Sequence, residues 1–228
     1  MDPADYEAWY HTPRGAWIAR REMALMTRLL RPRPGETLLD VGAGTGHFTR
    51  RFAEAGVDAT GLEPDPSMMA YARSRHPDLA FIQGEAGELP FAEGSFDWVV
   101  AVTSLCFVAE PETALAAMWR VARRGVLVGL LNRRSLLHRR KAGRGGYAGA
   151  RWDTPTDAAD WARRLDPAPV RMRWGTAVFF PGGGRAARLA EPLLPRKLPW
   201  GAFLAVQWAK PGDPSGSRSS RSPAAGNR

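Results

Sequence analysis

The stretch "LLDVGAGTGHF", residues 38 to 48, decides the fold because it places a glycine-rich corner directly after an apolar strand. In open α/β sheets, ligands bind at such corners, outside the carboxyl ends of the strands. Gly42, Gly44 and Gly46 have the spacing G-x-G-x-G. The third glycine of a dinucleotide fingerprint would stand at position 47, which is His47, and no Gly-Lys-Ser/Thr follows. The corner therefore predicts a ligand against the backbone, but it does not favour a phosphate.

Strand-like and helix-like segments alternate around this corner from residue 14 to about residue 132, a pattern typical of a parallel sheet with helices on its faces. Apolar runs predict strands over residues 36–41, 57–63, 79–84, 96–102 and 125–131, and two closing strands over 170–180 and 201–210. Capping residues and apolar periodicity predict helices over residues 13–30, 47–55, 65–76, 111–124 and 154–165.

Composition limits the function classes. The hydrophobic fraction of 44% is that of a globular protein, and no apolar run approaches the roughly 18 residues of a membrane span. The amino terminus lacks the features of a signal peptide, so we expect a cytoplasmic protein without a membrane span. With Cys106 as the one cysteine and four scattered histidines, we predict no disulfide and no metal site, and we expect Cys106 to be a buried hydrophobe.

The net charge of +9 is weak evidence for a polyanionic partner. Of 32 basic residues, 3 are lysines and 32 − 3 = 29 are arginines, a skew typical of coding bias. Residues 133–151 carry seven basic residues and no acid, and their glycines suggest a mobile loop. This basic stretch would suit an anionic acceptor, a polyphosphate backbone or a membrane surface, but a solvated loop is the favoured interpretation.

Acidic residues behind the corner indicate what the ligand contains. Glu63 ends the second strand, 63 − 42 = 21 positions after the first glycine, close to the spacing of about 20 at which a carboxylate grips a ribose diol. Glu85 follows the third strand, where its carboxylate or the Ala86 backbone would meet the amino edge of an adenine. Asp40, at the mouth of the first strand, would face a cationic group. Ribose, adenine and a cationic centre without phosphate describe S-adenosylmethionine better than NAD.

The segments "LLDVGAGTGHF", "GLEPD", "QGEAGELPF", "SFDWVVAVTSLCFV" and "MWRVARRGVLVGLLN", in this order, resemble the class I S-adenosylmethionine-dependent methyltransferases, in particular the type 11 group. The resemblance covers roughly residues 35 to 132. It implies an α/β, Rossmann-like fold with a seven-stranded, mostly parallel sheet, helices on both faces and an antiparallel last strand. The expected organisation is a single methyltransferase domain over residues 1–209, with an amino-terminal helical cap (1–34), a donor-binding core (35–132), acceptor-side segments with the closing strands (133–209), and a disordered tail (210–228).

The resemblance also implies roles for individual residues. Asp40 and the three glycines match the motif that holds the methionine part of the donor. Glu63 matches the ribose ligand, and Thr103, just past the fourth strand, matches a position near the sulfonium. The remaining matches are at the adenine, with Pro64 and Met68 beside the ring and Glu85 and Ala86 at its edge.

The sequence says less about which residues would bind the methyl acceptor. Where many relatives have a histidine or aspartate pair after the fourth strand, this chain has Cys106 and Phe107, so no acceptor-side base is assigned. His11 would be either a base in an amino-terminal lid or a surface residue, and the surface position is favoured. Arg14 would either bind the donor's carboxylate or lie in solvent, and the solvated position is favoured. His138 is expected to be solvated. Trp9, Tyr10 and Trp17 fit an aromatic acceptor pocket and packing of the first helix equally well.

We therefore expect an enzyme that transfers a methyl group from S-adenosylmethionine to a small-molecule acceptor. The sulfonium is already activated, so the main catalytic effect is in-line alignment of acceptor, methyl and sulfur with exclusion of water. The alternatives are a methyltransferase that acts on tRNA or rRNA and a non-catalytic protein that binds the donor. The small-molecule acceptor is preferred because the sequence holds no dedicated RNA-binding module.

Overall fold

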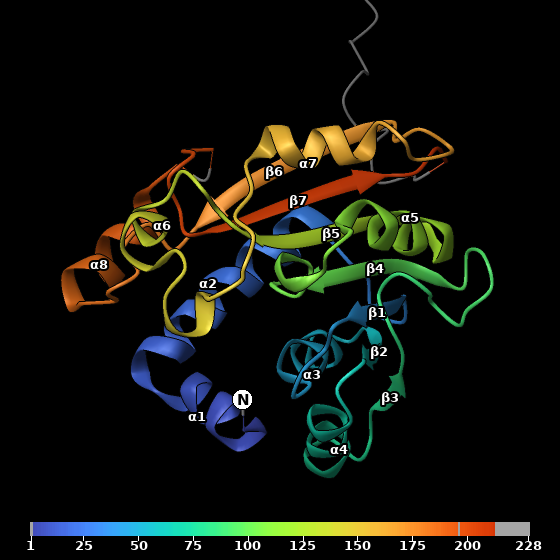
Figure 1. Cartoon of the computed structure of the whole chain (residues 1–228), viewed down its shortest axis with the longest axis horizontal. Helices are drawn as coiled ribbons and strands as arrows, with labels where there is room; N and C mark the ends of the chain where they lie inside the picture. Colours follow the sequence, from blue (N-terminus) through green and yellow to red (C-terminus); the bar gives the residue numbers. More distant parts are fainter. Residues whose placement is uncertain (1, 196, 213–228) are drawn as a thin grey trace, which may run out of the picture.

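The fold of the computed structural model is organised around one seven-stranded sheet in the order β3-β2-β1-β4-β5-β7-β6 (Figure 1). The structure describes residues 2–195 and 197–212. β1 to β5 are parallel neighbours, β7 runs antiparallel to both β5 and β6, and β6 closes the edge of the sheet. The strands are β1 (Thr37–Val41), β2 (Asp58–Glu63), β3 (Ala80–Gln83), β4 (Phe96–Val102), β5 (Ala122–Leu131), β6 (Arg171–Ala177) and β7 (Phe203–Ala209).

The helices begin at residues that suit helix starts. Thr12 caps α2 through its side chain, Asp65 caps α4, and Thr154 forms a capping box with Asp157 at the start of α7. The α-helices are α1 (Pro3–His11), α2 (Pro13–Leu30), α3 (His47–Glu54), α4 (Pro66–Arg75), α5 (Pro111–Val121), α6 (Leu136–Lys141), α7 (Pro155–Ala162) and α8 (Arg185–Ala190). Three short 3₁₀ turns accompany them: η1 (Leu105–Phe107), η2 (Gly145–Tyr147) and η3 (Glu191–Leu193).

The sheet is buried on both faces. Along β4, the side chains of Trp98 and Val100 pack into a core with α2 and α3, while Val99 and Ala101 pack into a second core with α5 and α7. This alternation follows from the period of two in a strand. A smaller cluster of Met69, Ala72 and Phe81 packs α4 against β3. Double-sided burial explains why the central strands read as continuous apolar runs.

The predicted fold class is confirmed, including the antiparallel strand among six that share one direction. All seven predicted strands are present, although β5 starts at Ala122 rather than Gly125. The helix predicted over 111–124 ends earlier, at Val121, because Ala122 already pairs with Phe96 in the sheet.

Three parts of the chain hold more structure than expected. Residues 3–11 form a separate helix, α1, capped by Asp2. The basic stretch, predicted as a mobile loop, contains α6 and η2, and Ser135 caps α6. The connection between β6 and β7 contains α8 and η3. Lys210, the first residue of the expected tail, is buried and its backbone N–H donates to the Arg124 carbonyl at 2.8 Å, while residues 213–228 of that tail lie outside the described residues.

Candidate donor site and acceptor wall

The glycine corner lies at the carboxyl end of β1, between β1 and α3. Gly42 has φ +74°, and a Cβ there would lie 2.4 Å from the Cβ of Ser104, so a side chain has neither the backbone conformation nor the space. Ser104 holds this approach in place by donating to the Val41 carbonyl at 2.7 Å. Gly44 has φ +56°, and a Cβ there would be in ordinary van der Waals contact with the Tyr6 ring at 3.8 Å. The corner thus presents its backbone between β1 and the Tyr6 ring of α1.

Glu63 closes the corner from β2. Its carboxylate accepts from the Gly44 N–H at 2.8 Å and from the Asp65 N–H at 3.1 Å. The side chain is buried, and burial raises the pKa of Glu63 against the opposing effect of those two hydrogen bonds. Each carboxylate oxygen accepts one backbone N–H and keeps a lone pair, which suits a pair of vicinal hydroxyls.

Asp40 sits below the corner with one oxygen unsatisfied. Its Oδ2 accepts from the Thr49 hydroxyl at 2.7 Å, but Oδ1 is buried without a hydrogen-bond partner. Burial, together with the negative charge of Glu63, raises the pKa of Asp40 to about 7. An unsatisfied buried carboxylate oxygen is costly, and a cationic ligand group is a chemically suitable partner for it.

The other predicted site residues lie on the segments that follow β2, β3 and β4. Glu85 is exposed but its charge acts on Glu63, and Ala86 is half-buried against the core. Met68 is half-buried on α4, and the Pro64 carbonyl accepts from the Gln83 side chain at 3.4 Å. Thr103 directly precedes Ser104, the residue that covers Gly42, and has φ +50°. A β-branched residue with positive φ is strained, and such strain concentrates at functional sites.

Helix α1 is pinned to the corner by a buried hydrogen-bond cluster. Glu7 accepts from the Thr45 hydroxyl at 2.6 Å and from His47 Nδ1 at 3.1 Å. His47 Nε2 accepts from Arg51 at 2.9 Å, so the ring carries its proton on Nδ1 and is neutral. Burial lowers the pKa of His47; burial alone would raise the pKa of Glu7, but the bonds from His47 and Thr45 outweigh it and lower it. His47, first noted only as a missing glycine, is therefore the anchor of α1.

Aromatic rings complete this anchor. The Tyr10 ring stacks on His47 with centroids 3.7 Å apart, and the Tyr6 and Tyr10 hydroxyls are 3.0 Å from each other. Trp17 and Tyr10 are buried in the core, so packing of the amino-terminal helices explains both. His11 lies at the surface with its side chain 68% exposed, as favoured from the sequence. Arg14 is exposed too, but its Nε donates to the Pro181 carbonyl at 2.7 Å and ties α2 to the connection before β7.

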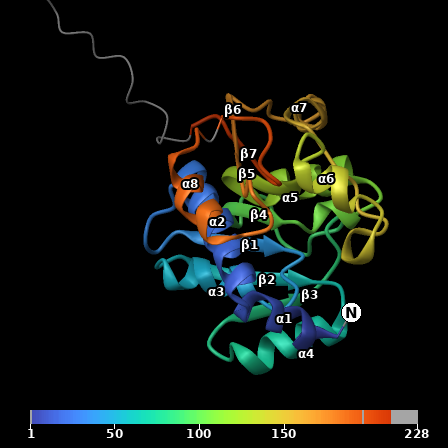
Figure 2. The same cartoon turned by 90° about the vertical axis from the view of Figure 1, so that its left-hand side faces the viewer.

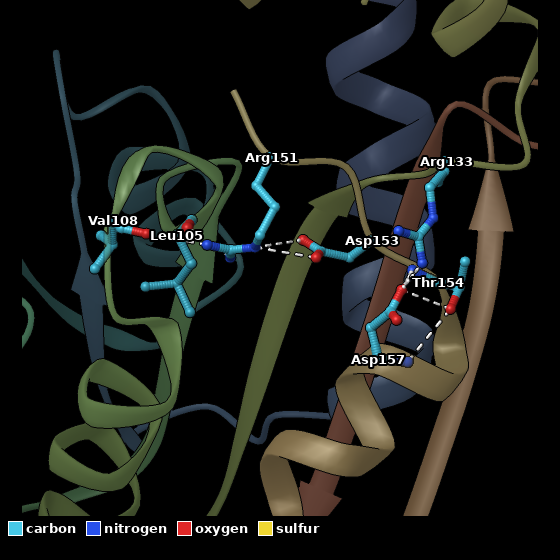
Figure 3. A network of polar contacts seen from close by, with 7 residues as sticks. All are labelled: Leu105, Val108, Arg133, Arg151, Asp153, Thr154 and Asp157. Atoms are coloured by element: carbon cyan, nitrogen blue, oxygen red, sulfur yellow. Dashed lines mark hydrogen bonds and ion pairs between the residues drawn. The ribbon is translucent and has the colours of Figure 1, made fainter. Parts of the chain in front are cut away.

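An arginine inside the basic stretch joins the segment after β5 to η1, and we call these two segments the acceptor wall (Figure 3). The Arg151 guanidinium lies 3.0 Å from Asp153 and donates to the carbonyls of Leu105 at 2.8 Å and Val108 at 3.0 Å. It therefore joins the segment after β5 to η1, the turn that follows β4. Next to it, Asp157 accepts from Arg133 and from the Thr154 side chain. The first and last cations of the stretch are thus structural, while Arg139, Arg140 and Lys141 on α6 are exposed.

Two other expectations concern this wall. Cys106 is buried and burial raises the pKa of its thiol to about 12, so it is the inert hydrophobe predicted from the sequence. His138 was expected to be solvated, but it is half-buried and its ring meets Trp152 edge to face, with centroids 5.1 Å apart.

Figure 2 shows α1, α6 and α8 gathered around the end of the sheet where the parallel strands finish. Two surface hollows of about 470 and 560 Å³ lie elsewhere, along α2.

Comparison with known proteins agrees with this geometry. Residues 39–129 match the model of a family described as "Methyltransferase domain". A demethylmenaquinone methyltransferase of Renibacterium salmoninarum is 45% identical over 92 residues, which are 40% of this chain and 39% of that protein. An uncharacterised protein of Mycobacterium tuberculosis is 34% identical over 171 residues, covering 68% of this chain and 55% of that one. The chain thus spans between about two fifths and half of the length of these curated relatives.

Among solved structures, an S-adenosylmethionine-dependent methyltransferase of Thermotoga maritima, described as a possible histamine N-methyltransferase, has a TM-score of 0.71 at 24% identity. The match covers 91% of this chain and 95% of that one, which establishes a shared fold. Fold and corner together define an α/β protein of the Rossmann-like class. Residues 39–129 match the methyltransferase domain, and the resemblance to the class I S-adenosylmethionine-dependent methyltransferases is confirmed; the cofactor of that family is S-adenosylmethionine.

Proposed function

We propose that this protein transfers the methyl group of S-adenosylmethionine to a small-molecule acceptor. The observation that carries the proposal is the unpartnered, buried Oδ1 of Asp40 beneath a glycine corner that Glu63 closes. A cationic α-amino group would satisfy Asp40, and the ribose diol would meet Glu63. Both parts of the site fit the donor without any phosphate.

The chain's own residues would supply positioning rather than covalent chemistry. The bound donor supplies an activated methyl group on a sulfonium. The corner and Glu63 would bind the two ends of the donor. Thr103 and Ser104 would lie beside the sulfonium, and α1 would cover the site and exclude water. Alignment of this kind is worth several kcal/mol of the barrier in a two-reactant step.

A small acceptor is favoured over RNA by where the structure puts its cations. Arg133 and Arg151 are bound to Asp157 and Asp153, so five cations of the basic stretch remain exposed, and three of these, Arg139, Arg140 and Lys141, form a short row on α6. The names of the relatives point the same way: one acts on demethylmenaquinone and another structure is described as a possible histamine N-methyltransferase. We include both compounds as candidate acceptors. Within the described residues, no helix has the length and apolarity to cross a bilayer.

The test has two stages. Isothermal calorimetry should give saturable heat with S-adenosylmethionine and with its demethylated product, and none with NAD. Methyl-labelled donor is then incubated with demethylmenaquinone, histamine and total RNA, and the labelled product is identified by mass spectrometry. Label in a small molecule supports the proposal; label in RNA that disappears when Arg139, Arg140 and Lys141 are neutralised replaces it with RNA methylation. No heat from the donor refutes it.

A further inference from the structure

A glutamate that sequence reasoning passed over lies on the acceptor side of the corner. Glu22, on α2, acts electrostatically on the hydroxyls of Tyr6 and Tyr10 from α1 and of Tyr147 from η2. Cys106, in η1, acts on Tyr6 and Tyr147 as well. Elements from three distant parts of the sequence therefore converge on one carboxyl. In Figure 1 the yellow loop after α6 descends toward the blue helices α1 and α2, which is where this convergence occurs.

Glu22 is unpaired in the part of the chain that the structure describes. No hydrogen bond or ion pair involves its carboxylate, and burial raises its pKa to about 8. Among the charges of described residues that act on the three tyrosines, the one cation is Arg14, which acts on Tyr147. The one other carboxylate facing the tyrosines, Glu7, is already committed to Thr45 and His47. A carboxyl left without a partner among protein groups points to a partner that is not protein.

The same residues remain open to a ligand. Glu22, Tyr6 and Tyr147 are half-buried, whereas Tyr10 and Cys106 behind them are buried. These residues border the donor corner, because the Tyr6 ring lies 3.8 Å from the position of a Cβ on Gly44. Aromatic and apolar side chains of the core back them, with the Tyr147 ring 5.5 Å from the Trp152 ring. A half-buried carboxyl among aromatic side chains, beside the donor corner, is arranged to take a proton from a bound acceptor.

We propose that Glu22 is the acceptor-side base, and that the cluster of Tyr6, Tyr147 and Glu22 binds a small aromatic acceptor through an ionisable hydroxyl group. This inference rests on the proposed methyl transfer. The hydroxyl proton passes to a carboxylate oxygen of Glu22, and the acceptor's oxyanion forms the new bond to the methyl carbon. The carbon–sulfur bond breaks and its electron pair stays on sulfur, which leaves the neutral thioether product. The proton returns to solvent when the product leaves.

A phenolic hydroxyl suits this site better than a preformed ion. Because Glu22 has no cationic partner among the described residues, negative charges on its carboxylate and on a preformed acceptor anion would repel each other without compensation. The pKa of Glu22 lies near neutral pH, which is where a general base is most effective. An ordinary exposed glutamate, with a pKa near 4.3, would be a much weaker base.

The test uses 4-nitrophenol, whose absorbance reports its own protonation state, with the full-length protein in the presence of S-adenosylhomocysteine. We expect saturable binding that shifts the absorbance, weakened about tenfold or more in Glu22→Gln while the affinity for the donor product is unchanged. Asp5→Asn, which removes an exposed carboxylate from α1, is the matched control and should bind as wild type. Circular dichroism checks that each variant is folded, and Glu22→Asp should restore part of the binding.

Turnover gives the second readout. With any phenolic acceptor that the wild type methylates, Glu22→Gln should lower kcat/KM by about 100-fold or more and should abolish the rise in rate through pH 8. Absence of 4-nitrophenol binding, or equal binding and an unchanged pH profile in Glu22→Gln, overturns the inference while leaving donor binding and the proposed function intact. Preferential binding of an aromatic amine over the phenol also overturns it. Failure of the donor product to bind would instead refute the proposed function on which this rests.

Discussion

His47 Nδ1 lies 3.1 Å from Glu7 Oε1, and this contact joins the first helix of the chain to the helix that follows the glycine corner. Its proton sits on Nδ1 because Nε2 accepts from Arg51. The bond therefore couples the order of α1 to the conformation of the corner. Tyr10, stacked on the same imidazole, extends the contact over the ring face.

Replacing Glu7 by Gln should loosen this helix without unfolding the protein. The variant leaves the buried His47 and Thr45 with weaker partners, a loss of about 1–3 kcal/mol in the docking of α1. Hydrogen exchange of residues 3–11 should become about tenfold faster or more, while the amides of β4 keep their protection. Asp5→Asn on the same helix is the control. Unchanged exchange in α1 would mean that the apolar contacts alone hold it.

Replacing Glu63 by Gln should weaken donor binding strongly. The amide cannot accept from Gly44 and Asp65 and a diol at once, and charge-assisted bonds of this kind are worth about 1.5–3 kcal/mol, or roughly 10–100-fold in Kd. Calorimetry with S-adenosylmethionine measures this directly. Glu88→Gln, an exposed change after β3, should bind as wild type. A Glu63 variant with wild-type affinity would remove Glu63 from the donor site.

Donor affinity should also depend on the charge of Asp40. Burial places its pKa at about 7, so the carboxyl is mostly neutral at pH 6 and mostly ionised at pH 7.5. Because only the ionised form pairs with a cationic amino group, we expect binding to be on the order of five to ten times weaker at pH 6. Asp40→Asn should bind weakly at both values. A wild-type affinity that is the same at pH 6 and pH 7.5 would contradict this role.

The sign of the linked stability change follows from the same pKa. The folded pKa of Asp40 is raised above its ordinary value, so its contribution to stability is complete at low pH and is lost as the pH rises through about 7. Bound donor should counter that loss. The increase in melting temperature caused by S-adenosylmethionine should accordingly be larger at pH 7.5 than at pH 6.

Arg151→Ala should destabilise the acceptor wall. It leaves Asp153, which is 2% exposed, without its ionic partner and removes donors from the Leu105 and Val108 carbonyls. Allowing for the partial exposure of the arginine, we expect a loss of about 2–3 kcal/mol, which corresponds to a melting temperature roughly 5–10 °C lower. Arg139→Ala, on the exposed side of α6, should stay within about 0.5 kcal/mol of wild type. Equal stability of the two variants would mean that the contacts of Arg151 in Figure 3 contribute little to the free energy of unfolding.

The core of the fold could be read from the sequence because its signals are local. Continuous apolar runs gave the buried strands, and Thr12, Asp65 and Thr154 marked helix starts that the structure confirms. The gathering of Asp40, Gly44 and Glu63 was also predictable, since each follows from its place at the carboxyl end of a parallel strand. Their roles toward the donor stay predictions until binding is measured.

The acceptor side could not be read in the same way. Glu22 looks like any polar residue of an amphipathic helix, and its distinction comes from Tyr147, 125 positions away in the sequence. The loop that carries Tyr147 is joined to η1 by Arg151. The helix over residues 136–141 was hidden by the glycines and cations around it, although Ser135 was a usable capping signal. Tertiary contacts, rather than local preference, determine this part of the molecule.

The arrangement of the two half-sites has a consequence for how such proteins diversify. The residues proposed to bind the donor lie between positions 39 and 104, whereas Tyr6, Glu22 and Tyr147 come from segments on either side of that core. If these proposed roles hold, acceptor preference can change, or be transferred from one relative to another, while the donor half is inherited unchanged. A protein that shares residues 39–104 with this one would then be free to bind a different acceptor.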